Sequence, residues 1–267
     1  MTLFNDKSAL ELDRLNVEVL GRSRQIKYLR GILSGIEQGF LPKLVSVYGL
    51  PGSGKTLVTR KVCQEYEKKF FDRFRFIYVN LGEAKTVFSC ANKLLVAMGG
   101  VWRTGKSGLD LVVEEFWSKV LGWKGESPRF MLVALDEADN LFMDRRGNPS
   151  GFLYRLVRNE EKLEGSGIKL SLITISNQLI TEIWELDARV RSSIGFEEVL
   201  FKPYTIQELH DILVERCKEA FNPDVVDPEV IKGCASYTGE ESRDVRKMLE
   251  IMRFCGEVAE KENDEKV

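Results

Sequence analysis

The chain has 267 residues, 43% of them hydrophobic and 30% charged, and its formal net charge is −2, so nucleic-acid binding would need a local basic patch. Five scattered cysteines with no CxxC pair, and a single histidine, argue against a zinc site or a disulfide framework. No apolar run reaches the length of a membrane span and no signal-peptide block opens the chain, so we expect a soluble, intracellular (cytoplasmic) protein with no membrane partner.

Short apolar runs alternate with segments of helical periodicity along the first 200 or so residues. The expected strands are 43–49, 73–81, 129–139, 169–177 and 196–204, and the expected helices are 21–38, 56–70, 86–98, 109–123 and 152–163. Continuously apolar strands that alternate with helices predict an α/β fold with a mostly parallel five-stranded sheet, covered by helices on both faces.

The pattern changes after Pro203, where only helices are expected, at 205–221, 228–237 and 242–260. We therefore expect two domains, an α/β domain at 1–202 and a small all-α domain at 203–267.

The loop after the first strand carries the P-loop spacing Gly49-x-x-x-x-Gly54-Lys55-Thr56. Glycines let backbone N–H groups converge on phosphate oxygens, and the positive end of the following helix faces the same phosphates. Lys55 would reach the β and γ phosphates, and Thr56 would offer its hydroxyl to Mg²⁺. The sequence thus predicts binding of ATP or ADP with Mg²⁺. The expected contacts in this loop are Gly49, Pro51, Gly52, Ser53, Gly54, Lys55, Thr56 and Leu57.

Polar side chains follow two later strands, at the sheet edge where open α/β proteins bind ligands. Asp136 would hold Mg²⁺, commonly through water, and Glu137 would orient and deprotonate the attacking water. Asn177, at the end of the fourth strand, could hold that water or the γ-phosphate. In isolation, a pair of acids after a strand is common and an Asn in this position often caps a turn. The order of P-loop, Asp-Glu and strand-end Asn, followed by a helical domain, is the layout of the AAA+ class of ATPases.

Within that class the chain resembles the replication-initiator ATPases of the origin recognition complex and cell-division-control family, of the archaeal type. The similar stretches are "VYGLPGSGKT", "FIYVNL", "LDEADNL", "GFLYRLVR", "ITISNQ", "DARVRSSIGFEEVLFKPYTIQELHDIL" and "SRDVRKMLEIMRFCGEVAE". The resemblance covers nearly the whole chain. It implies a slow, switch-type ATPase that binds duplex DNA in replication initiation, with the helical domain as the AAA+ lid.

The resemblance also implies roles for residues outside the P-loop. Arg246 would be the second sensor, reaching the γ-phosphate from the lid; Arg243 stands where the family prefers glycine, so the start of this helix could be built differently. Arg189 is the candidate arginine finger for a neighbouring subunit's site, with Arg191 as the competitor. The adenine-side pocket is expected over roughly 17–25, which includes Val19, and Tyr204 is a further expected contact with ATP.

DNA contacts are expected from an insertion at 86–108, whose tip carries Trp102, Arg103 and Lys106. The alternative is a solvated loop with two unrelated cations. Members of the family usually continue into a winged-helix domain, and the residues up to Val267 do not contain one. The sequence could be a shortened piece of such a protein or a naturally short relative, and both alternatives stay open.

The implied partners are duplex DNA, other AAA+ initiator subunits or a second copy of the chain, and the replicative helicase. A nucleoid or, in a eukaryote, nuclear location would follow. Two other functions remain open at this point: an AAA+ regulator of another DNA transaction, such as transposition target selection, and a small-molecule P-loop kinase. No cluster for a kinase's second substrate is evident in the sequence.

Overall fold

Two compact units divide the chain, and the computed structural model describes residues 2–11, 19–144, 146–179 and 196–267 of them. The larger unit comprises residues 24–49 and 55–200, and the smaller comprises 1–23, 50–54 and 201–267. Within the described ranges, no helix is long and apolar enough to cross a bilayer.

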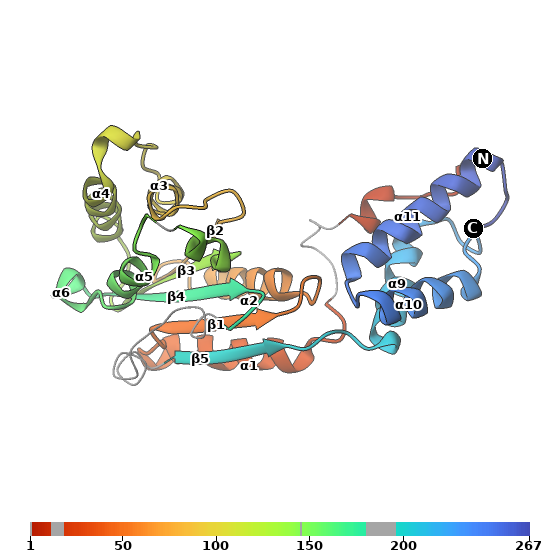
Figure 1. The fold of residues 1–267 in the computed structure, drawn as a ribbon. Helices are drawn as coiled ribbons and strands as arrows, with labels where there is room; N and C mark the ends of the chain where they lie inside the picture. Colours follow the sequence, from red (N-terminus) through yellow and green to blue (C-terminus); the bar gives the residue numbers. More distant parts are fainter. Residues whose placement is uncertain (1, 12–18, 145, 180–195) are drawn as a thin grey trace. The chain divides into compact units, whose positions relative to one another are not determined.

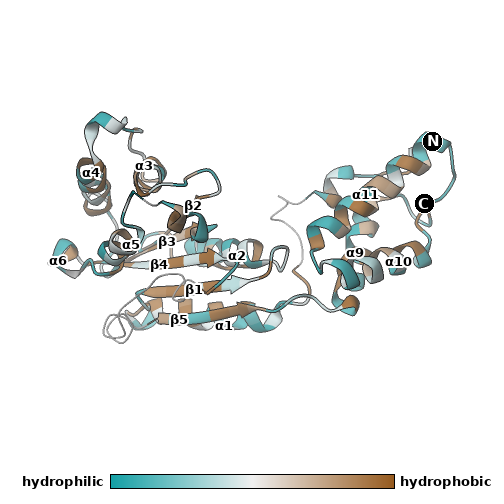
Figure 2. Cartoon of the chain, in the orientation of Figure 1, coloured by the Kyte–Doolittle hydropathy of each residue, from teal (hydrophilic) through white to brown (hydrophobic). Residues whose placement is uncertain are grey.

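The larger unit is built on a five-stranded sheet with the order β2-β3-β4-β1-β5 (Figure 1). Its strands are β1 (Leu44–Gly49), β2 (Phe74–Asn80), β3 (Arg129–Asp136), β4 (Ile168–Ser176) and β5 (Phe196–Phe201). The pairs β2–β3, β3–β4 and β4–β1 are all parallel. β1, β3 and β4 are almost wholly buried, as a parallel sheet covered on both faces requires, and β1 is largely apolar in Figure 2. The predicted parallel α/β fold is confirmed.

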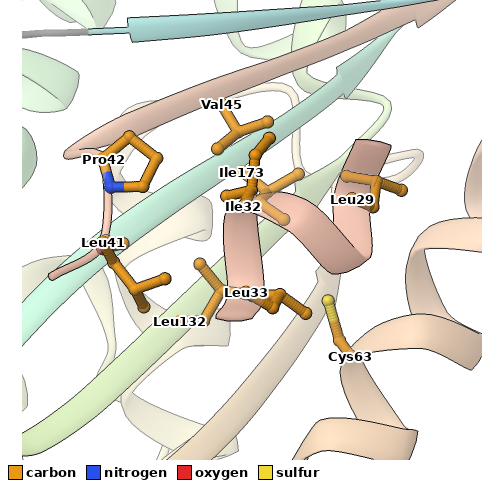
Figure 3. A pocket seen from close by; sticks show the side chains of 10 residues that line it. Leu29, Ile32, Leu33, Leu41, Pro42, Val45, Cys63, Leu132 and Ile173 are labelled. Atoms are coloured by element: carbon orange, nitrogen blue, oxygen red, sulfur yellow. The ribbon is translucent and has the colours of Figure 1, made fainter. Parts of the chain in front are cut away.

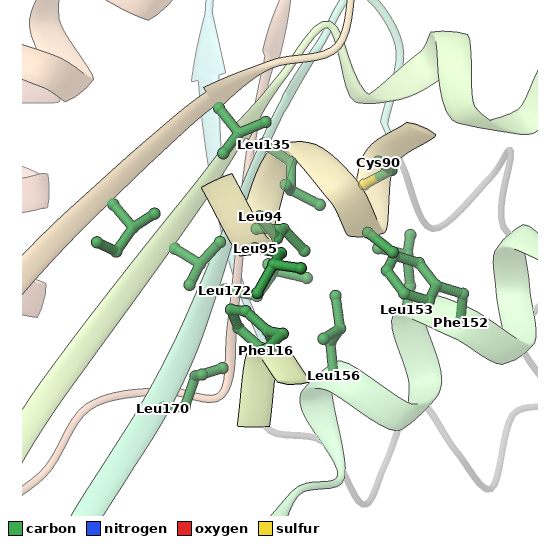
Figure 4. Close-up of a cluster of buried hydrophobic side chains, with 14 of the residues drawn as sticks. Cys90, Leu94, Leu95, Phe116, Leu135, Phe152, Leu153, Leu156, Leu170 and Leu172 are labelled. Atoms are coloured by element: carbon green, nitrogen blue, oxygen red, sulfur yellow. The ribbon is translucent and has the colours of Figure 1, made fainter. Parts of the chain in front are cut away.

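Helices cover both faces of this sheet. α3 (Val87–Ala97), α4 (Leu109–Leu121) and α5 (Pro149–Val157) bury their apolar sides in one large core, to which Phe116 of α4 and Leu172 of β4 both belong (Figure 4). α1 (Ser23–Ser34) and α2 (Lys55–Lys69) lie on the other face, where a cavity of about 10 Å³ remains between Leu33, Cys63 and Ile173 (Figure 3). A space of that size, lined by apolar groups, has no room for a ligand beyond a single water.

The helix expected over 152–163 forms as two shorter helices, α5 and α6 (Glu160–Leu163). α5 begins earlier than expected because Asn148 caps it, accepting from the Gly151 N–H, and Pro149 occupies the first turn. The break follows from Asn159, whose side-chain amide donates to the carbonyl of Leu156 and so competes with the helical hydrogen bonds.

The smaller unit contains α9 (Ile206–Ala220), α10 (Pro228–Glu241) and α11 (Val245–Glu262). All three carry both apolar and polar residues (Figure 2), and their apolar sides share one core. The N-terminal segment belongs to this unit: Phe4 stacks on Phe221 with ring centroids 4.5 Å apart, and the short helix η1 (Lys7–Leu10) buries Leu10 in the same core. The first residues of the chain therefore pack with its last ones.

Candidate nucleotide-binding site

The candidate site residues of the larger unit lie at the carboxyl ends of its strands. Register pairs Asn80 at the end of β2 with Asp136 at the end of β3, and Asp136 with Ile175 of β4. Glu137 and Asn177 directly follow two of these strands, so the structure brings them to the edge at which β1 ends and the P-loop begins.

Thr56 and Asp136 are in direct contact at this edge. The Thr56 hydroxyl donates to Asp136 Oδ2 at 2.8 Å, and the Asp136 side chain is buried. Because the Thr56 proton is donated, both lone pairs of its oxygen stay available to a cation. In the described ranges no group of three His, Cys, Asp or Glu side chains could hold a metal. Mg²⁺ at nucleotide sites is usually bound through one or two protein oxygens together with phosphates and water. The donor set fits Mg²⁺ bound together with a nucleotide.

Lys55, the first residue of α2, is buried beside the same strand ends. Its ammonium group donates to the carbonyl of Gly49 at 2.7 Å and to Asn177 Oδ1 at 3.4 Å. Asn177 in turn donates to Asp139 Oδ2 at 3.2 Å. Asn177, predicted to hold the attacking water or the γ-phosphate, therefore lies between the P-loop lysine and the carboxylate of Asp139. Sequence reasoning did not single out Asp139, although it lies three residues after Asp136.

Glu137 has an unusual backbone conformation and two amide partners. Its φ of +54° lies in the left-handed region, which non-glycine residues rarely adopt and which is often found at functional sites. Its N–H donates to Asp136 Oδ1 at 2.9 Å, so the two acids are linked. Its carboxylate accepts from the side-chain amides of Asn80 and Asn140, each at 3.2 Å. The exposed carboxylate is thus held in place at the strand ends by two neutral donors.

Residues 50–54 of the P-loop are grouped with the smaller unit, where two glycines pass close to other side chains. Gly52 and Gly54 have φ values of +71° and +85°. A Cβ on Gly52 would lie 1.9 Å from Asp244 Oδ1, and one on Gly54 would lie 2.8 Å from the Tyr204 hydroxyl. Both conformation and clearance therefore require glycine at these positions.

Arg22 supports this loop from within the smaller unit. It is buried, donates to the carbonyls of Ser53 and Lys202 at 2.8 Å each, and lies 3.5 Å from the ring centre of Tyr204. Burial raises the pKa of Tyr204. Tyr204, predicted as an ATP contact, is therefore part of a packed cluster around Ser53, while Val19, the candidate on the adenine side, is half-buried.

Arg246, the candidate second sensor, lies in the first turn of α11 and is paired with Asp244. Its guanidinium donates to both Asp244 oxygens, at 3.0 and 2.8 Å, and its backbone N–H donates to the same carboxylate, which caps the helix. Although burial opposes it, the pairing with Arg246 holds the pKa of Asp244 below its usual value. Arg243, at the position where the family resemblance implied glycine, has a φ of +53°, which lies in the left-handed region that glycine adopts most readily.

The proposed DNA-binding tip is braced against α3 and α4. Arg103 donates through two nitrogens to Glu115, at 2.9 and 2.7 Å, and its backbone N–H donates to Asn92 at 2.6 Å. Trp102 is 49% exposed and Lys106 is exposed. Arg103 is therefore engaged in an ion pair, whereas Trp102 and Lys106 face solvent.

Arg189 and Arg191, the candidate arginine finger and its competitor, lie outside the described residues. At the strand ends, sequence reasoning did not identify four polar side chains that contact Asp136, Glu137 or Asn177. They are Tyr78, Asn80, Asn140 and Asp139. Asn80 carries a usable signal, because it ends a strand at the same edge; the other three become evident only from the folded contacts.

Comparison with known proteins supports the architecture across the chain. A model of the AAA domain family matches residues 39–179, and one described as the Cdc6 AAA+ ATPase-type lid domain matches 210–267. An ORC1-type DNA replication protein 1 from Sulfolobus acidocaldarius is 36% identical over 260 residues, covering 97% of this chain and 63% of the relative. The structure of Aeropyrum pernix ORC1 in complex with DNA aligns with a TM-score of 0.83 and 31% identity, over 100% of this chain and 67% of that one. Pyrobaculum aerophilum Cdc6p shares the fold, with a TM-score of 0.82 at 19% identity.

The P-loop at the end of β1, the acids at the end of β3 and the matched AAA domain together define an AAA+ protein of the ATPase class. Within this class, the chain belongs to the family of ORC1-type DNA replication proteins and Cdc6. It spans 63% of the length of the curated S. acidocaldarius relative that it matches.

Proposed function

We propose that this chain binds ATP with Mg²⁺, hydrolyses it slowly, and uses the change of nucleotide to control binding of duplex DNA during replication initiation. The proposal that the chain binds a nucleotide is supported most directly by the contact of Thr56 with Asp136 beside the buried Lys55. Lys55 would neutralise the β and γ phosphates, and Thr56 and Asp136 would hold Mg²⁺, which supplies charge neutralisation when bound.

Glu137 would orient and deprotonate the attacking water. Its carboxylate accepts one hydrogen bond at each oxygen, from Asn80 and from Asn140, and each oxygen keeps a second lone pair that can accept from the water. Slow hydrolysis is what the family resemblance implies, and it suits a protein whose product is a change of state. Asn177, Arg246 from the lid and Arg189 from a neighbouring subunit would contact the γ-phosphate.

If Arg189 acts in the site of a neighbouring subunit, the ATPase activity per molecule should rise with protein concentration. An activity per molecule that does not change with concentration would argue against this role.

Replication initiation is the DNA transaction that the relatives support. The matched relatives are named as ORC1-type replication proteins, and one solved relative is described in complex with DNA. These matches favour initiation over transposition target selection or small-molecule phosphorylation. Other initiator subunits and the replicative helicase are the proposed protein partners.

The tip at residues 102–106 is the proposed DNA contact of this part of the protein. Two cations neutralise about two phosphates, so the logarithmic salt dependence of binding should have a slope on the order of −2. Replacing Arg103 and Lys106 together by alanine should flatten that slope and leave ATP binding intact. Anisotropy titrations with duplex DNA across a salt series measure both quantities, with Lys124→Ala/Lys162→Ala as the matched control of two exposed lysines elsewhere.

A second variant tests the same DNA contact through the ion pair between Arg103 and Glu115. Glu115→Gln removes the carboxylate that engages Arg103 and should strengthen DNA binding if the guanidinium contacts phosphate. Unchanged DNA binding in both the double variant and Glu115→Gln would show that the tip is a solvated loop and that DNA is held elsewhere.

A further inference from the structure

Tyr78 contacts the candidate magnesium ligand directly, although no sequence motif contains it. Its hydroxyl donates to Asp136 Oδ2 at 2.7 Å, the same oxygen to which Thr56 donates. Tyr78 lies on β2, next to Ala134 in the register of β3, so its side chain reaches the acid from the neighbouring strand. The carboxylate is thus held from two elements, β2 and α2.

Arg60 and the surrounding protein hold the Tyr78 ring in this position. The Arg60 guanidinium lies 4.5 Å from the ring centre and comes from α2, one turn after Thr56. The contact with Arg60 and the hydrogen bond to Asp136 therefore leave the Tyr78 side chain little freedom to turn away.

The three hydrogen-bond donors around Asp136 occupy most of the positions at which its carboxylate can accept a hydrogen bond. A carboxylate oxygen has two lone pairs, and Tyr78 and Thr56 fill both positions at Oδ2. At Oδ1 the Glu137 N–H takes one position, which leaves one for a magnesium-bound water. Thr56 and the backbone of Glu137 belong to elements that bind or act on the nucleotide, whereas Tyr78 belongs to a sheet strand that is independent of it.

We propose that Tyr78 is a positioning residue for the Mg²⁺–nucleotide complex, because its hydroxyl fixes the orientation in which Asp136 meets the metal. This inference rests on the proposed function as a nucleotide-binding protein. Hydrogen-bond donors to metal-binding carboxylates typically change metal affinity by about 10- to 100-fold when removed.

The variant Tyr78→Phe tests this role, because it removes only the hydroxyl and keeps the aromatic ring that the Arg60 guanidinium contacts. Mn²⁺ binding to the protein–ADP complex, measured by electron paramagnetic resonance, should weaken about tenfold. ADP affinity in EDTA, measured by calorimetry, should stay within about twofold of the parent, since no metal is involved there. Tyr66→Phe is the matched control: it removes a hydroxyl that donates to the Arg30 carbonyl at 3.0 Å, away from the strand ends.

Unchanged Mn²⁺ affinity in Tyr78→Phe would overturn the inference, and so would an equal loss of ADP affinity with and without metal. If Tyr78→Phe does not fold, incorporation of 4-aminophenylalanine at position 78 supplies a replacement donor. That protein should keep Mn²⁺ affinity near the parental value, and a tenfold loss would overturn the inference. A parent protein that binds no nucleotide at all would refute the proposed function instead, so the two failures are distinguishable.

Discussion

Lys55→Ala is expected to weaken ATP binding by about 30- to 150-fold, which corresponds to roughly 2–3 kcal/mol for charge-assisted hydrogen bonds. Lys55 is the first residue of α2, buried at the strand ends, and its ammonium group lies 2.7 Å from the carbonyl of Gly49. Alanine keeps the helix and removes the charge that would meet the β and γ phosphates. Calorimetric titration with ATP and Mg²⁺ measures the loss.

Lys68→Ala is the control for this variant, because Lys68 is exposed near the other end of the same helix. It should bind ATP like the parent. Thermal unfolding of both variants checks that the fold is kept. ATP affinity unchanged in Lys55→Ala would reject the assignment of this loop as the phosphate site.

Glu137→Gln should retain ATP binding and lose turnover by about 100-fold or more, the range for removal of a general base. Glutamine keeps the shape of the side chain and one oxygen for Asn80 or Asn140, but it cannot take a proton from water. Single-turnover hydrolysis of radiolabelled ATP measures the chemical step separately from product release.

Glu126→Gln serves as the matched substitution, since Glu126 is exposed and lies ahead of β3, at the opposite end of the strand from Glu137. Its turnover should equal that of the parent. Normal single-turnover hydrolysis by Glu137→Gln would mean that another group activates the water.

The order and boundaries of the elements were largely predictable from the sequence, because buried parallel strands are continuously apolar and end in polar or glycine-rich turns. β1 and β4 each lie within one residue of the expected strand, whereas β5 ends at Phe201, three residues early. The break between α5 and α6 was missed because it depends on Asn159 bonding to helix carbonyls, which periodicity does not reveal.

The site was predictable where a local spacing encodes the chemistry. The P-loop and the Asp-Glu pair are continuous motifs, so their residues could be named directly. Tyr78 and Asn140 could not, because their roles come from contacts with Asp136 and Glu137 across other elements. The left-handed backbone conformation of Glu137 could not be predicted from the sequence either, because glutamate rarely adopts it and only the fold imposes it.

The affinity of this chain for duplex DNA with ATP, with ADP and without nucleotide tests the central claim most directly. Fluorescence anisotropy with one labelled duplex, at one salt concentration, compares the three states. A nucleotide switch predicts that the ATP and ADP states differ at least about fivefold, the lower end of typical coupling between two sites, and that Lys55→Ala removes the difference. Equal DNA affinity in all three states, in protein that calorimetry shows to be saturated with nucleotide, would contradict the account.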